Sequence, residues 1–199
     1  MHQLTSVTKL CCLTLLLLLT FSHASFGQKD KLFESLEEAM TVPKDSVYQL
    51  LLKRQHLETI PEVIYTFENL TYLDLTKNKL TQVPDKISQL KHLKTLKLNR
   101  NRIDTISEAL GELKELEVLE MFMNEIYELP NSIGQLTELR KLDMWSNNIS
   151  SLPESIQNCK KLEFADFRSI KLNIEQQEDM RILLPLDAEV HFSNTCNCY

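Results

Sequence analysis

Short stretches in which leucine alternates with other residues recur along this chain at a fixed interval. In chain order these segments are YLDL, TLKL, VLEM and KLDM. They begin at residues 72, 95, 118 and 141, so that neighbouring segments lie 23 residues apart. Alternation at every second position is the period of a half-buried β-strand. Each stretch is followed by a second apolar group in constant register, as in VPDKISQL and LPNSIGQL. We therefore expect each unit to contain a strand and a returning segment that packs against it.

An asparagine stands at one fixed point of four consecutive units. These residues are Asn78, Asn101, Asn124 and Asn147, whereas the outermost units have Gln55 and Ile170 at that point. Six units of one length indicate a solenoid, in which atypical end units are typical of capping. At the end of each strand the chain must turn inside the stack, and an Asn side chain offers both donors and an acceptor to the backbone there. We expect these asparagines to form a structural ladder and not a binding site.

The repeat unit resembles a known family. The pattern L-x-x-L-x-L-x-x-N-x-L, followed by L-P-x-x-I-x-x-L, extends from Val47 to about Leu172 and is similar to leucine-rich repeats. The resemblance implies an α/β solenoid with a parallel sheet on one face and short helices or turns on the other. Because the returning half of each unit is wider than the strand, we expect the stack to curve with its strands on the concave side. The arrangement of the ends looks like that of small secreted bacterial leucine-rich repeat proteins.

The segments on either side of the repeats are expected to be caps. Apolar residues at helical spacing predict a short amphipathic helix at Lys29–Met40 that covers the first unit. After the last unit we expect a helix near Glu175–Leu184, ended by Pro185, and a brief strand at Glu189–Phe192. The predicted parts of the chain are a signal peptide at 1–27, an N-terminal capping helix at 28–46, six repeats at 47–172, and a C-terminal cap and tail at 173–199.

The first 27 residues have the composition of a cleavable secretory signal. Lys9 precedes the apolar run Leu10–Phe21, and small residues follow it. This run is shorter than the roughly 20 apolar residues that a bilayer-spanning helix needs. An uncleaved anchor is the less favoured alternative. We expect a secreted or periplasmic protein with no membrane span after signal removal.

Composition limits the chemistry of this protein. Its net charge is −6, with 28 acidic against 22 basic residues, which argues against nucleic-acid binding. Cys159 replaces a repeat leucine and is expected to fill space in the core. Cys196 and Cys198 could bridge each other, pair with another molecule or belong to a flexible tail. Two thiols are too few for a structural metal site, so we expect no metal and no cofactor.

Side chains between the strand leucines are expected to face solvent on the concave side. The first three units carry mainly cations there, and the last three carry aromatic and acidic residues. Exposed aromatic residues rimmed by charge are typical of protein-binding patches. We hypothesise that Phe122, Met123 and Trp145 form the centre of such a patch, with Glu120 and Asp143 setting its charge preference. The full candidate set is Tyr72, Asp74, Lys97, Arg100, Glu120, Phe122, Met123, Asp143, Trp145, Phe164 and Asp166.

Two alternatives for Trp145 are that the C-terminal segment folds over it, or that it is exposed without a role.

No glycine-rich phosphate loop, G-x-S-x-G or H-E-x-x-H motif occurs, and we expect no catalytic residues. The predicted function is binding of an unidentified protein by a monomer, with a secreted enzyme inhibitor or a carbohydrate or matrix attachment protein as alternatives. The sequons at Asn69 and Asn148 would be glycosylated only in a eukaryotic secretory route.

Overall fold

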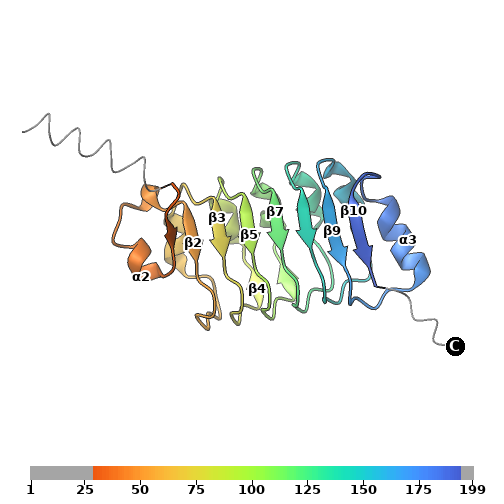
Figure 1. Ribbon diagram of the computed structural model, residues 1–199, viewed down its shortest axis with the longest axis horizontal. Helices are drawn as coiled ribbons and strands as arrows, with labels where there is room; N and C mark the ends of the chain where they lie inside the picture. The colour runs from red at the N-terminus through yellow and green to blue at the C-terminus, as the bar shows by residue number, and fades with distance from the viewer. Residues whose placement is uncertain (1–28, 194–199) are drawn as a thin grey trace, which may run out of the picture.

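The computed structural model describes residues 29–193, in which parallel strands lie side by side in a single row (Figure 1). Each strand pairs with its neighbour in exact 23-residue register through the repeats, for example Leu73 with Leu96 and Leu96 with Leu119. The sheet has eight strands in chain order: β1 (Leu32–Phe33), β2 (Gln49–Leu51), β3 (Tyr72–Asp74), β5 (Thr95–Lys97), β7 (Val118–Glu120), β8 (Lys141–Asp143), β9 (Phe164–Phe167) and β10 (Glu189–Phe192).

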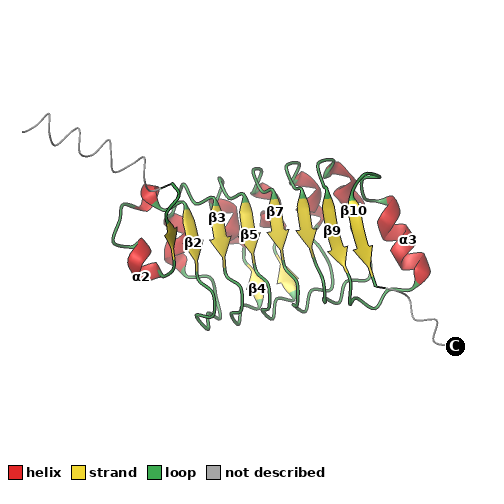
Figure 2. Ribbon diagram, viewed as in Figure 1, coloured by secondary structure: helices red, strands yellow, loops and turns green. Residues whose placement is uncertain are grey.

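Short 3-10 helices return the chain behind this sheet (Figure 2). Proline immediately precedes most of them, and its fixed φ and missing N–H suit it to the start of a helical turn. A small second sheet pairs β4 (Gln82–Val83) with β6 (Thr105–Ile106). The 3-10 helices are η1 (Lys44–Ser46), η2 (Glu62–Thr66), η3 (Asp85–Gln89), η4 (Glu108–Glu112), η5 (Asn131–Gln135) and η6 (Glu154–Asn158).

One hydrophobic core runs the length of the described solenoid. The central strand leucines Leu73, Leu96, Leu119 and Leu142 are fully buried, and Ala165 takes the same position in β9. The fully buried residues of the returning segments include Ile87 and Ile133. No single unit could bury its apolar face alone, so stacking supplies the core. The predicted fold class, a leucine-rich repeat solenoid, is confirmed.

The N-terminal cap differs from the prediction in its first half. We expected one helix at Lys29–Met40, but Leu32 and Phe33 form strand β1, and only Leu36–Ala39 is helical (α2). Without β1, strand β2 would be the edge of the sheet, and its backbone hydrogen-bonding groups would be exposed. Strand β1 hydrogen-bonds to that edge in parallel, and the fully buried side chain of Phe33 packs on the core.

The C-terminal cap has the expected helix and strand. Helix α3 (Ile174–Ile182) begins at a capping box in which Asn173 and Gln176 exchange hydrogen bonds. Strand β10 then pairs with β9, and Phe192 stacks on Phe167 with ring centroids 5.6 Å apart.

No helix within residues 29–193 is long and apolar enough to cross a membrane. The predicted signal at 1–27 and the cysteines Cys196 and Cys198 lie outside the described residues.

Candidate functional site

The repeated asparagines set the geometry of the loops that follow the strands. The Asn78 side chain donates to the carbonyl oxygens of Leu52 and Leu75, both at 2.8 Å, and accepts from the N–H of Gln55 at 2.9 Å. It therefore ties its own unit to the preceding one. Equivalent side-chain bonds are made by Asn101, Asn124 and Asn147. These amides satisfy buried backbone groups, which would each cost about 1–3 kcal/mol if left unpaired.

The residue before each of these asparagines, and before Gln55 and Ile170 at the same point of the outermost units, has a left-handed backbone. Arg54, Lys77, Arg100, Met123, Ser146 and Ser169 all have φ between 55° and 60°. Their N–H groups donate to the next unit, as from Lys77 to the Asn99 carbonyl and from Met123 to the Trp145 carbonyl, both at 2.8 Å. These six residues therefore form a row along the ends of the strands. We call it the strand-end row.

The charged column in the middle of the sheet is less exposed than the sequence suggested. Strand register places Asp74, Lys97, Glu120, Asp143 and Asp166 side by side. We expected all of them to face solvent, but Asp74, Glu120 and Asp166 are 0 %, 8 % and 3 % exposed. Side chains of the same or a neighbouring unit contact them, such as Tyr72 on Asp74 and Lys141 on Glu120. The expectation of an open acidic surface was wrong for these three carboxylates.

Each of these three carboxylates has a cationic partner. Asp74 contacts Lys53 at 3.1 Å and also accepts from the Tyr72 hydroxyl and the Thr76 N–H. Burial and the neighbouring Asp74 charge raise the pKa of Tyr72 to about 12, so the phenol remains a donor. Asp166 is held by Arg168 at 2.6 Å.

Glu120 is the most connected of these acids. It contacts Lys141 at 2.7 Å and Lys97 at 3.3 Å, and Asn99 donates to it at 3.1 Å. Burial alone would raise the pKa of Glu120, but these hydrogen bonds and cations lower it below its usual value. Its charge is therefore satisfied internally, and Lys97 is occupied as well.

Asp143 is the exception in this column. It is half-buried, and its hydrogen bond comes from the backbone N–H of Trp145 at 3.3 Å. No cation of residues 29–193 forms an ion pair with it. Burial raises the pKa of Asp143, and the nearby charges of Asp166 and Glu120 add to the rise. Asp143 is thus a carboxylate whose charge is poorly compensated.

The aromatic residues lie next to Asp143. The rings of Phe122 and Trp145 are in tilted contact, with centroids 5.6 Å apart, and both are partly exposed. The Trp145 indole N–H donates to the Ser169 hydroxyl at 3.1 Å. Strand β10 extends the sheet beyond β9 and leaves Trp145 partly exposed. Phe164 lies farther along the sheet, against His191 and Lys141. We call Phe122, Met123 and Trp145, with Asp143, the aromatic patch.

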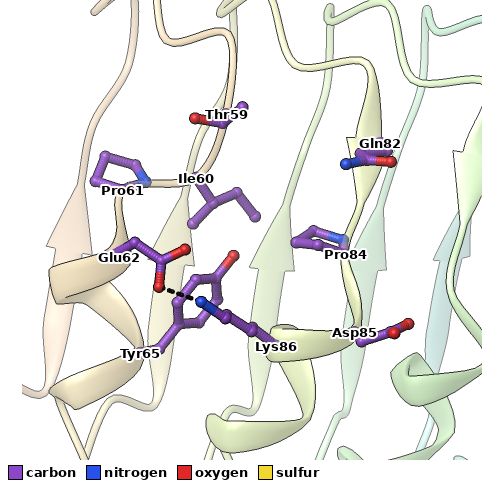
Figure 3. Close-up of a pocket in the computed structure, with 9 residues that line it drawn as sticks. All are labelled: Thr59, Ile60, Pro61, Glu62, Tyr65, Gln82, Pro84, Asp85 and Lys86. Atoms are coloured by element: carbon purple, nitrogen blue, oxygen red, sulfur yellow. Dashed lines mark hydrogen bonds and ion pairs between the residues drawn. The ribbon is translucent and has the colours of Figure 1, made fainter.

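A pocket that the sequence analysis missed opens on the opposite side of the solenoid, between η2 and η3 (Figure 3). Its volume is about 410 Å³, and the ring of Tyr65 stands among the lining residues. The ion pair between Glu62 and Lys86, 2.6 Å long, forms part of the wall. One signal for it exists in the sequence, because Tyr65 takes the repeat position that Gly111 and Gly134 take later. The lining residues are Thr59, Ile60, Pro61, Glu62, Tyr65, Gln82, Pro84, Asp85 and Lys86.

The cysteine in the repeats and the two glycosylation sequons differ in their exposure and contacts. Cys159 is fully buried and contacts the Ile133 carbonyl. The Asn69 side chain donates to the Asp45 carbonyl at 2.7 Å, whereas Asn148 is exposed. In the part of the chain that the structure describes, no cluster of three or more His, Cys, Asp or Glu side chains could hold a metal ion.

Comparison with known proteins gives the class. Family models described as leucine rich repeat match residues 68–126 and 138–159. Together with the parallel sheet and the stacked units, these matches define a solenoid of repeated strand and 3-10 segments. The chain belongs to the leucine-rich repeat family. No curated protein matches it in sequence.

Solved structures of this class resemble the chain. A leucine-rich repeat protein of Leptospira interrogans is 31% identical over 73% of this chain and 36% of its own, with a TM-score of 0.66. The plant peptide hormone receptor RGFR1, solved in complex with RGF2, is 25% identical over 76% of this chain and 26% of its own, with a TM-score of 0.57. This chain thus spans about a third or less of the length of either protein.

Internalin C2 of Listeria monocytogenes is 20% identical over 82% of this chain and 68% of its own, with a TM-score of 0.64. At this identity the likeness concerns the fold alone.

Proposed function

We propose that this protein is an exported module that binds a protein partner through the solvent-facing side of its eight-stranded sheet, without catalysis. The observation that carries the proposal is the aromatic patch. Phe122 and Trp145 are in contact and partly exposed, and the half-buried Asp143 beside them lacks a cation among the described residues. Aromatic residues and methionine are enriched at the centres of protein interfaces.

The surroundings of the patch favour binding over a structural role. The other acids of the column are neutralised by Lys53, Lys97, Lys141 and Arg168, so their charges are used within the protein. Trp145 is held by one hydrogen bond to Ser169 and is therefore presented in a defined orientation. A rigid aromatic side chain loses little conformational entropy when a partner covers it.

Export rests on the apolar run with its preceding Lys9, and the proposal therefore includes a secreted or periplasmic location for a monomer. A receptor of similar fold was solved in complex with a peptide hormone, which supports a polypeptide as the class of partner. The enzyme-inhibitor alternative uses the same surface and differs only in the identity of the partner.

The test uses a displayed library of random peptides of about 12 residues, long enough when extended to cross the sheet. Peptides selected on the wild-type protein should lose about 2 kcal/mol of binding energy, roughly 30-fold in affinity, on Trp145→Ala. The matched control is Tyr127→Ala, which removes a 64 % exposed aromatic side chain outside the sheet. Both variants should unfold at nearly the wild-type temperature.

Selected peptides that bind Trp145→Ala as tightly as wild type would contradict the proposed site. Specific binding on a glycan array that disappears in Trp145→Ala, with no peptide enriched, would instead favour the carbohydrate attachment alternative.

A further inference from the structure

We propose that the sheet selects an extended polypeptide segment by the order of its charges. An acidic stretch lies on Arg54, Lys77 and Arg100, an apolar side chain lies on Phe122 and Trp145, and a basic group approaches Asp143. This inference rests on the proposed function and adds the chemistry of the partner to it.

The first observation is that the three cations at the start of the strand-end row have no acidic partner among the residues that the structure describes. The other cations on this face, including Lys97 and Lys141, form ion pairs with the acidic column. No carboxylate between residues 29 and 193 forms an ion pair with Arg54, Lys77 or Arg100. The charge of Arg54 lowers the pKa of Lys77, and partial burial and the charge of Arg100 lower it further. The three side chains therefore repel one another without internal compensation.

The second observation is the backbone at these positions. Arg54, Lys77 and Arg100 have φ values of 57°, 60° and 57°, where a β-carbon is unfavourable and glycine or asparagine would be tolerated better. The fold does not need a cation there, since Ser146 and Ser169 take the same place with φ values of 57° and 56°. Backbone strain and charge repulsion thus coincide in three consecutive units. A ligand with negative charge would offset the repulsion.

The spacing fits an extended acidic segment. Neighbouring parallel strands lie about 4.8 Å apart, so the three cations extend over roughly 10 Å. Arginine can bind a carboxylate through two parallel hydrogen bonds, and an acidic residue placed along this row meets at least one cation. Carboxylates on a peptide can therefore be bound without a pocket.

The row leads directly to the aromatic patch. The Arg100 N–H donates to the Phe122 carbonyl, and the Met123 N–H donates to the Trp145 carbonyl, both at 2.8 Å. A segment that crosses the strands from β2 towards β9 consequently meets positive charge, then Phe122 after β7, and then Trp145 together with Asp143, which belong to the same unit. A polypeptide can supply all three groups in that order.

A polyanionic sugar is less suited to this surface. It has neither a large apolar side chain for Phe122 and Trp145 nor a cation for Asp143. The net charge of the whole chain, −6, also opposes a strongly anionic polymer over most of the molecule.

The experiment selects peptides on the wild-type protein and then measures their affinity for the wild type and for a triple variant, Arg54→Ser, Lys77→Ser and Arg100→Ser. Serine is already accommodated at this backbone position in two later units. The selected pool should be enriched in peptides that carry acidic residues on one side of an aromatic or aliphatic residue and a basic residue on the other. These peptides should bind the triple variant at least about tenfold more weakly, and their affinity should fall with added salt.

Two further variants complete the design. Asp143→Asn should weaken selected peptides that contain the basic residue and leave the binding of peptides without it unchanged. The matched control for charge is Lys160→Glu, which alters an exposed residue on the side of the 3-10 helices and should leave affinity unchanged. Thermal unfolding of every variant checks that the solenoid is intact.

Peptides without acidic enrichment, or with equal affinity for the triple variant, would overturn the charge order while the proposed function stands if Trp145→Ala still weakens them. Failure to enrich peptides, or peptides insensitive to Trp145→Ala, would overturn both. Binding of heparin that the triple variant loses, without selection of acidic peptides, would assign the row to a sulfated polysaccharide and overturn the inference.

Discussion

The acidic residues in the middle of the sheet differ in their surroundings more than in their chemical type. Asp74, Glu120 and Asp166 lie against cations, and two of them also accept from nearby side chains. Asp143 occupies the same point of the unit between those of Glu120 and Asp166, and within residues 29–193 its one hydrogen bond comes from the Trp145 N–H. Three of these charges are therefore compensated within the described structure, and that of Asp143 is not.

Asp143→Asn should stabilise the folded protein at neutral pH. Burial, with the charges of Asp166 and Glu120, raises the pKa of Asp143 above its ordinary 3.8, while the Trp145 N–H and Lys141 oppose the rise. The ionised form thus costs native stability. The cost is absent below the unfolded-state pKa and grows as pH rises through the folded-state pKa. We expect a gain of about 0.5 kcal/mol near pH 7 that disappears near pH 3, measured by chemical denaturation.

Asp187→Asn is the control, because it removes the same charge from an exposed residue. An equal gain in both variants, or a gain that persists at low pH, would show that net charge and not the surroundings of Asp143 is responsible.

At the scale of elements, one repeat position controls how closely the 3-10 helices stack. A β-carbon on Gly111 would lie 2.6 Å from the Ser132 carbonyl oxygen, and one on Gly134 would lie 2.2 Å from that of Ser155. These glycines therefore permit η4, η5 and η6 to pack backbone against backbone. Tyr65 takes the same position in η2, where a large ring keeps η2 away from η3 and lines the pocket.

Gly134→Ala should destabilise the protein by about 1–3 kcal/mol, because η5 and η6 must separate to admit the added methyl group. Chemical denaturation measures the loss. Ser88→Ala changes the equivalent residue of η3, where a β-carbon already exists, and should have a much smaller effect. A variant Gly134→Ala as stable as wild type would show that the helices stack without this close approach.

At the scale of the molecule, the core is continuous from Phe33 in β1 to Leu184 after α3. Each unit depends on its neighbours for burial, so the ends are protected by β1 with α2 and by α3 with β10. Cys159 lies in this core, 0 % exposed, and burial raises the pKa of its thiol to about 11. Its reactivity therefore reports on opening of the stack.

In a chain that begins at residue 28 and carries Cys196→Ser and Cys198→Ser, Cys159 should react with a thiol reagent at least about a thousandfold more slowly in the native state than in denaturant. The rate should rise together with the loss of secondary structure. Fast labelling at native conditions would contradict a single cooperative core and would indicate that the last units open separately.

The repeat pattern was sufficient to predict much of the fold, because strand leucines and turn asparagines recur every 23 residues. The helix and strand of the C-terminal cap were also predicted, since Pro185 separates a helical pattern from a short strand. The N-terminal cap was not, because Leu32 and Phe33 fit a helix by spacing and become a strand only through pairing with β2. The aromatic patch was predicted as a set of residues, and its role remains a prediction.

The sequence by itself determined the stacked architecture, because every unit repeats the leucines that are buried and the asparagine that hydrogen-bonds to the neighbouring unit. Only the tertiary structure decided which charges are free. Partners such as Lys141 for Glu120 come from an adjacent unit 21 residues away, and their distances depend on strand register and side-chain direction. Within residues 29–193 the same packing gives Asp74 an ion pair with Lys53 and leaves Asp143 and the three cations of the strand-end row without one. These contacts arise between units, and no unit's sequence contains them alone.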